Sequence, residues 1–258
     1  MRCPHLLLAA LLAAARLQAQ QPAQVEVLAS IMMTEDRRVL DPAILAPALE
    51  HPDPLVRRTA IVAIGRIGNP DGVLLLIPRL NDPEPSVVTE AFFAIGLLGD
   101  PRAVAPIHDR LRLTDSIAQA ALPEAATALA RIGSDQALDL LRGIITGASD
   151  LPQARMEQMR GQAVLESWRH GSRAPVTAIL PLVRDTSVAM RWQALYTLAR
   201  LSAPEAVEGF IDAVRDRTPL LREVGARGLS RRVADSSGAV HSDFVRELVR
   251  LLDDDQPV

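Results

Sequence analysis

The chain has 258 residues and a formal net charge of −3, and its residues are 48% hydrophobic but only 3% aromatic. A core of Ala, Leu, Val and Ile with so few aromatic residues favours closely packed helices over a β-sandwich or a β-barrel. All 28 basic residues are arginine, and because the chain carries no net basic charge, the composition argues against a partner that is nucleic acid.

Residues 1–19 have the features of a signal peptide. Arg2 precedes an apolar run from Leu6 to Leu12, and Leu17-Gln-Ala19 offers a cleavage site for signal peptidase. The run is shorter than the about 20 residues that span a bilayer, so we expect no integral membrane span. Cleavage would also remove the single cysteine, Cys3. The mature protein is therefore predicted to be exported, either periplasmic or secreted, with a buried N-terminal helix as the alternative.

A repeated pattern follows, after a linker and an N-terminal helix predicted over residues 20–39. The segment Leu55–Asp71 recurs 31 residues later as Ser86–Arg102, and looser copies continue toward the end of the chain. Before each copy lies a shorter apolar helix, and a turn rich in Asp and Pro, such as His51–Pro54, joins the two helices. Residues 40–258 are thus predicted to form an all-α, right-handed solenoid, a superhelix of about six helical pairs whose last repeat is incomplete.

The longer helix of each pair carries an apolar stripe. In the first copy the stripe has the 3.6-residue period of one helix face and consists of Val56, Ala60, Ala63, Ile64 and Ile67. One pair cannot bury such a stripe alone, whereas stacked pairs share a continuous core. The opposite side of this helix is predicted to present Arg58, Val62, Gly65 and Arg66.

The pattern Asp-Pro-x-Val-Arg-x-x-Ala-x-x-Ala-Ile-Gly-x-Ile-Gly-Asp-Pro resembles the short HEAT repeat of the phycobilisome lyases, over roughly residues 40 to 258. The resemblance implies that the longer helices line a concave face and that an arginine after each turn joins a ladder of polar contacts. The matching positions are Arg57, Arg160, Arg191 and Arg222. Because Val88 and Leu122 take this position in the second and third copies, the implied ladder is interrupted.

A second resemblance concerns the whole chain. An exported leader, a first helix ending at Arg38 and short HEAT repeats are similar to the N-terminal part of bacterial HEAT proteins that end in a cyclophilin-type prolyl isomerase. The segment Asp253–Val258 matches the turn inside a seventh pair, which suggests a fragment with a missing downstream domain. The apolar helix predicted over Val240–Leu252 would lack its cap, so we expect fraying after about Ser237 or C-terminal self-association.

No catalytic, cofactor or metal site is predicted. In deoxyhypusine hydroxylase, HEAT repeats hold iron through His-Glu pairs, but no histidine of the mature chain is followed by glutamate or has a second histidine three or four residues on; these histidines are His51, His108, His170 and His241. The sequence contains no Gly-x-Ser-x-Gly nucleophile motif either, and only the repeat type supports a lyase activity.

Two sets of residues on the exposed side of the long helices are candidates for partner binding. Aligned with the first long helix, later copies place aromatic residues away from the apolar stripe, and this predicted aromatic wall consists of Phe93, Trp168, Trp192 and Tyr196. Five of the six long helices end with an arginine at one position, and this predicted basic ridge consists of Arg66, Arg131, Arg169, Arg200 and Arg231.

Each set also has a structural interpretation. The aromatic residues could pack between neighbouring helices, and the arginines could offset the helix dipole. Two hypotheses of function follow: a non-enzymatic scaffold that binds a protein or peptide in the cell envelope, or the substrate-holding arm of a longer peptidyl-prolyl isomerase whose catalytic domain is not in this chain.

Overall fold

The computed structural model describes residues 24–113 and 116–230, together with positions 233, 235, 245, 246 and 249. The predicted signal peptide, Arg231, His241 and the last turn lie outside the described residues. Of the predicted final helix only three positions are described, so its fraying or self-association stays a prediction.

The described residues form two layers of helices and contain no strand. One layer holds the longer helices, which are residues 24–37, α3 (Pro54–Ile67), α5 (Pro85–Leu98), α7 (Ser116–Ile132), α9 (Gln153–Glu166), α11 (Val188–Leu201) and α13 (Pro219–Gly228). The other layer holds α2 (Pro42–Leu49), α4 (Val73–Leu76), α6 (Val104–Arg112), α8 (Asp135–Thr146), α10 (Val176–Ile179) and α12 (Val207–Val214). Short 3-10 segments extend these helices: η1 (Pro70–Gly72), η2 (Ile77–Asn81), η3 (Pro101–Ala103), η4 (Ser167–Arg173), η5 (Leu180–Arg184) and η6 (Pro204–Ala206).

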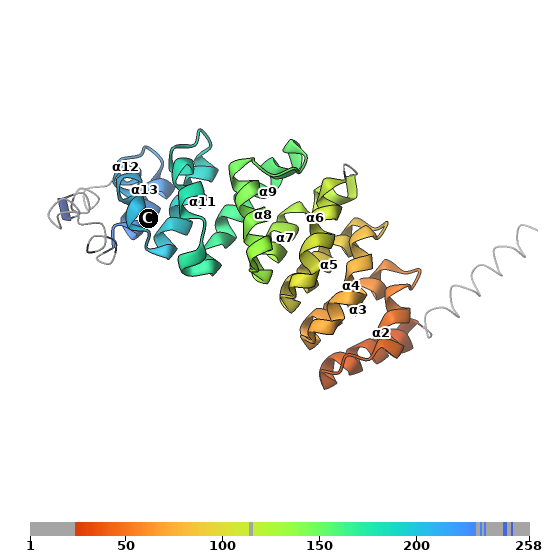
Figure 1. Ribbon diagram of the computed structural model, residues 1–258. Helices are drawn as coiled ribbons and strands as arrows, with labels where there is room; N and C mark the ends of the chain where they lie inside the picture. Colours follow the sequence, from red (N-terminus) through yellow and green to blue (C-terminus); the bar gives the residue numbers. More distant parts are fainter. Residues whose placement is uncertain are drawn as a thin grey trace, which may run out of the picture.

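The pairs stack in a single row, with α2 at one end and α12 and α13 at the other (Figure 1). Consecutive long helices contact one another along the row, from α3 to α13. The prediction of an all-α solenoid of about six pairs is confirmed, and the right-handed sense of its superhelix stays a prediction. Within the described ranges, no helix is both long enough and apolar enough to cross a membrane.

The turns fold as the Asp and Pro pattern predicts. Asp53 precedes α3 in an extended conformation, and its side chain accepts a hydrogen bond from the amide of Leu55. Pro54 occupies the first helical position, where no amide hydrogen is needed. Gly68 ends the helix with a φ of 76°, a left-handed geometry that a glycine adopts without strain.

Proline also divides the shorter helices. The sequence predicts one helix from Gly72 to Leu80, but the α-helical part ends at Leu76 and continues as a 3-10 turn that contains Pro78. Proline has no amide hydrogen for the helical bond and its ring crowds the preceding turn. The same change occurs at Pro181 in the fifth pair, between α10 and η5.

The apolar stripe of the first long helix lies in the core, as predicted, because all five of its residues are buried. Gly65 falls opposite the apolar stripe by helical period, yet it is buried against the next long helix. A Cβ at this position would lie 2.9 Å from the Cβ of Ala94, and one at Gly96 would lie 3.0 Å from the Cα of Ala128. These glycines are retained because α3, α5 and α7 approach one another too closely for a side chain.

We expect Gly65→Ala to lower the free energy of unfolding by about 1 kcal/mol, because overpacking against Ala94 outweighs the better helix propensity of alanine. Gly161→Ala is the matched control, since its new Cβ would meet only the mobile end of Gln193. That variant should be neutral or more stable by up to about 1 kcal/mol. Urea unfolding followed by circular dichroism measures both; equal effects at the two glycines would contradict the close approach.

Arginines at the implied ladder positions make the polar contacts that the resemblance implies. Arg57 donates from Nε and Nη2 to both carboxylate oxygens of Asp82, at 2.8 and 2.7 Å, and from Nη1 to the carbonyls of His51 and Pro52. Arg191 repeats this arrangement, with Nη1 bonded to the carbonyls of Asp185 and Thr186. Its Nη2 lies 3.6 Å from a carboxylate oxygen of the Asp216 side chain. The ladder therefore ties each of these turns to the next pair.

Two buried arginines stabilise the stretch where the ladder is interrupted. Val88 and Leu122 lie fully in the core, as the interruption implies. Near them, Nε of Arg110 donates to the carbonyl of Leu80 at 2.6 Å, and Nη1 of Arg155 donates to the carbonyls of Arg110 and Leu111. Arginine again satisfies carbonyls at the end of a short helix, but from positions that the repeat pattern does not identify.

Arg57→Met should lower the free energy of unfolding by about 3–5 kcal/mol, because it leaves the carboxylate of Asp82 buried without its cation. The side chain of Asp82 is only 1% exposed. The double variant Arg57→Met with Asp82→Asn should recover part of this loss, since no unpaired charge remains. Thermal unfolding by calorimetry measures the three proteins, and an additive double variant would argue against a direct pair.

Candidate partner-binding surface

The long-helix face, the side of the long helices turned away from the short ones, carries the predicted aromatic wall. Trp192 and Tyr196 stand one turn apart on α11, with their rings stacked at 5.1 Å and an interplanar angle of 20°. Both are half-buried and pack against the core, so the structural interpretation accounts for part of their surface. Phe93, on α5, is half-buried too.

Trp168 lies elsewhere than predicted. The sequence places it on the fourth long helix, but α9 ends at Glu166 and Trp168 belongs to the 3-10 segment η4. A 3-10 turn advances by a different angle per residue, so the alignment of helical positions fails beyond Glu166. Gly171 breaks the segment further, with a φ of 53° and a ψ of −122°.

Part of the basic ridge and part of the aromatic wall meet on one surface. The guanidinium of Arg200 lies 3.6 Å from the ring centroid of Trp168, and its Nη1 donates to the hydroxyl of Tyr196 at 3.1 Å. Arg169 also approaches the ring of Trp168, at 4.9 Å. Together, these residues form what we call the aromatic–arginine cluster, which consists of Trp168, Arg169, Trp192, Tyr196 and Arg200.

Three other predicted residues, which are Arg66, Phe93 and Arg131, lie outside this cluster. Arg131, on α7, covers the ring of Phe93 at 5.2 Å and forms a second, smaller contact of the same kind. Arg66 pairs with Glu35 at 2.9 Å at the other end of the row. The structure thus joins five of the nine predicted residues and places Arg66, Phe93 and Arg131 apart from them.

A row of glutamates on the same face was missed from the sequence. Glu124 lies 4.0 Å from Arg131, and its Oε1 is buried without a hydrogen bond among the described residues. Burial raises the pKa of Glu124; the charge of Arg131 opposes this shift, and the charges of Glu166 and Glu90 add to it. The sequence did contain one signal of this row. Glu124 follows Glu90 by 34 residues, the same offset that aligns Thr127 with Phe93, so the two glutamates occupy equivalent positions on successive long helices.

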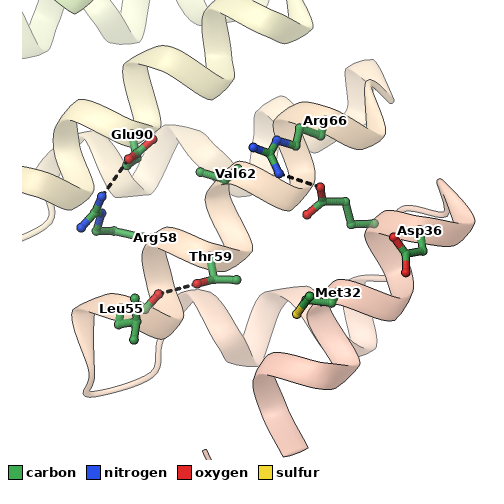
Figure 2. Close-up of a pocket in the computed structure, with 9 residues that line it drawn as sticks. Met32, Asp36, Leu55, Arg58, Thr59, Val62, Arg66 and Glu90 are labelled. Atoms are coloured by element: carbon green, nitrogen blue, oxygen red, sulfur yellow. Dashed lines mark hydrogen bonds and ion pairs between the residues drawn. The ribbon is translucent and has the colours of Figure 1, made fainter. Parts of the chain in front are cut away.

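A pocket of about 350 Å³ opens on this face between the helix at residues 24–37, α3 and α5 (Figure 2). Met32 and Leu55 supply exposed apolar surface to it. Two ion pairs flank it. One joins Arg58 and Glu90 at 3.0 Å (Figure 2), and the other joins Arg66 and Glu35. The repeat pattern did not predict this pocket, because it arises where the N-terminal helix meets the first repeat.

Two of the three histidines in the described part of the chain have hydrogen-bond partners, whereas Nε2 of His170 is buried without one among the described residues. Nδ1 of His51 accepts a hydrogen bond from the amide of Asp53, and Nε2 of His108 lies 2.7 Å from Oδ1 of Asp150. Burial and the charges of Arg173 and Arg169 lower the pKa of His170. Among the described residues, no group of three His, Cys, Asp or Glu side chains could hold a metal ion.

Comparison with known proteins supports the repeat type. The family model for HEAT repeats matches residues 42–122 and 75–158, so this part of an α-helical solenoid consists of HEAT repeats. The match is to HEAT repeats alone, and it gives no support to the predicted resemblance to cyclophilin-type isomerases. No curated protein matches the chain.

The chain is also similar to solved structures. The complex of CpcE and CpcF of phycocyanin lyase from Nostoc sp. PCC7120 is 19% identical, with 86% of each chain covered and a TM-score of 0.43. An engineered protein is 18% identical over 93% of this chain and 71% of that chain, with a TM-score of 0.47. Human deoxyhypusine hydroxylase is 18% identical over 93% and 85%, with a TM-score of 0.34.

Glu124→Gln should stabilise the protein at neutral pH. A carboxyl whose pKa is raised by folding favours the folded state while it is protonated, and this contribution is lost as the pH rises through the folded pKa. The advantage of the glutamine variant should therefore grow above about pH 4.3, the ordinary pKa of glutamate. Thermal melts from pH 4 to pH 8 test this, and an advantage that shrinks with rising pH would contradict it.

Proposed function

We propose that this chain is a non-enzymatic HEAT-repeat scaffold of the cell envelope that binds a protein or peptide on its long-helix face. The export of the chain is part of the proposal and rests on the signal-peptide features of residues 1–19. N-terminal sequencing of the native protein should find Gln20 first, and an intact Met1 would contradict export.

The aromatic–arginine cluster is the observation that carries this proposal. Tryptophan, tyrosine and arginine are the residues that contribute most to protein interfaces, because they combine a large apolar surface with directed hydrogen bonds. Here they gather on one face of the array, where Trp192 and Tyr196 are half-buried against the core and keep part of their rings exposed. Both tryptophans and the only tyrosine of the chain belong to the cluster, so its composition is far from that of the remaining surface.

Replacing Trp192 and Tyr196 together by alanine should abolish partner binding, because it removes the stacked rings and the hydroxyl that positions Arg200. The wild-type chain and the double variant would be immobilised and exposed to an envelope extract from the source organism. A partner retained by the wild type should be lost or weakened at least about tenfold in the variant.

A matched control replaces Leu74 and Leu113 by alanine. Both are exposed apolar residues that belong to the short-helix layer, at 57% and 48% exposure, so this variant also loses apolar surface but leaves the cluster intact. Circular dichroism must show that both variants are folded. If the cluster variant retains the partner and the control loses it, the binding surface lies on the other layer.

The prolyl-isomerase arm remains the alternative hypothesis, and it rests on resemblance alone. In that case the long-helix face would hold a substrate for a catalytic domain encoded further along the gene. The genomic sequence after the codon for Val258 distinguishes the two. A cyclophilin-like domain there would support the alternative, and an in-frame stop codon would contradict it.

A further inference from the structure

Arg200 has an unusual environment for a surface arginine. One face of its guanidinium lies 3.6 Å from the centroid of the Trp168 ring, so stacking fixes the plane of the group. Its Nη1 donates to the hydroxyl of Tyr196, which fixes its rotation within that plane. A guanidinium has five N–H donors, all of which lie in the plane of the group. A ring that stacks on its face therefore accepts no hydrogen bond from them. Most of the donor edge of Arg200 is therefore left for another acceptor.

The other described arginines of the basic ridge differ from Arg200 because each has a carboxylate nearby. Arg66 pairs with Glu35, Arg131 lies 4.0 Å from Glu124, and Arg169 pairs with Glu166. Among the described residues, the hydrogen bond and ring contacts of Arg200 are with Trp168 and Tyr196, and it pairs with no carboxylate. It is thus a cation held in place without its counter-ion.

The other charges near Arg200 are paired. Arg169 contacts the same ring of Trp168 but pairs with Glu166, and Arg173 pairs with Asp135. Among the described residues, the positive charge beside Trp168 that lacks a carboxylate is therefore that of Arg200, which attracts an anion and repels a cation.

We propose that Arg200, oriented by Trp168 and Tyr196, binds the carboxylate of an aspartate or glutamate in a partner polypeptide. This inference rests on the proposed function and specifies the partner as an acidic segment. The planar fork of a guanidinium matches the two oxygens of a carboxylate, and a preoriented fork loses little side-chain entropy on binding. Trp192 and Tyr196 lie beside it and supply apolar surface for the residue next to the acid.

A carboxylate suits this site better than a phosphate. Arg169 is already paired with Glu166, so one guanidinium is left without an anion, which balances the single charge of a carboxylate. A phosphoryl group carries nearly two negative charges and three acceptor oxygens. A single guanidinium neutralises only one of these charges and bonds to only two of the oxygens.

A phage-displayed library of random 12-residue peptides, selected on the immobilised full chain, is the first probe. Selected sequences should be enriched in Asp or Glu beside an apolar residue, and they should not bind the Trp192→Ala, Tyr196→Ala variant. One selected peptide is then synthesised with Glu, Gln, Lys or phosphoserine at the acidic position. We expect Arg200→Gln to weaken the Glu peptide about tenfold to hundredfold and the Gln peptide hardly at all.

Two variants keep this test independent of folding. Arg142→Gln, which removes an exposed arginine that pairs with Asp139 on α8, should bind the Glu peptide as the wild type does. Arg200→Glu should prefer the Lys peptide over the Glu peptide, and a misfolded protein cannot show such an inverted preference.

The outcomes separate the two proposals. If peptides bind the cluster without acidic enrichment, or if Arg200→Gln binds the Glu peptide unchanged, the carboxylate site is wrong and the scaffold proposal stands. If the phosphoserine peptide binds more than tenfold tighter than the Glu peptide, the site recognises phosphate and the carboxylate assignment is overturned. If no selected peptide depends on Trp192 and Tyr196, both proposals fail.

Discussion

The structure depends on the contact between consecutive long helices. A single helical pair exposes its apolar stripe, so each pair is stable only because its neighbours cover it. Gly65 and Gly96 show how tight this contact is, since a methyl group at either position would meet the backbone or Cβ of the next helix. Each long helix packs against the long helices before and after it and against the short helices. The side that is left is the long-helix face.

Arginine has two separate roles in this lysine-free chain. Inside the array, Arg57, Arg110 and Arg155 bond to backbone carbonyls at turns and helix ends, where several donors on one planar group satisfy several acceptors at once. On the long-helix face, Arg131 and Arg200 lie over aromatic rings. Lysine could fill neither role equally well, because its ammonium group is compact, strongly hydrated and poorly suited to stacking.

Much of the fold could be predicted from the sequence because the repeat makes its features local. The stripe that begins at Val56, the cap at Asp53 and the left-handed glycine at Gly68 all depend on residues within or next to a single helix, α3. The burial of Gly65 could not be predicted in this way, because it depends on where α5 lies. Helical period alone does not place a neighbouring helix.

The candidate site shows the same limit. The residue types of the aromatic wall and the basic ridge were identified from the sequence. Their contact in one cluster was not, since Trp168 and Arg200 are far apart in sequence and meet only in the folded chain. Trp168 was misplaced because the α-helix ends before it. The pocket beside Met32 was missed because the N-terminal helix stands outside the repeat pattern.

The buried hydrogen bonds of Arg155 bear on how the molecule responds to acid. Its side chain is 2% exposed and bonded to the carbonyls of Arg110 and Leu111. Neither a guanidinium nor a carbonyl gains or loses a proton between acidic and alkaline conditions. These internal ties therefore persist when the medium is acidified, whereas a carboxylate held by Arg200 would be neutralised. Acid below about pH 4, the ordinary pKa range of Asp and Glu, would thus weaken the hold on such a partner while leaving the carbonyl-bound frame of the array in place.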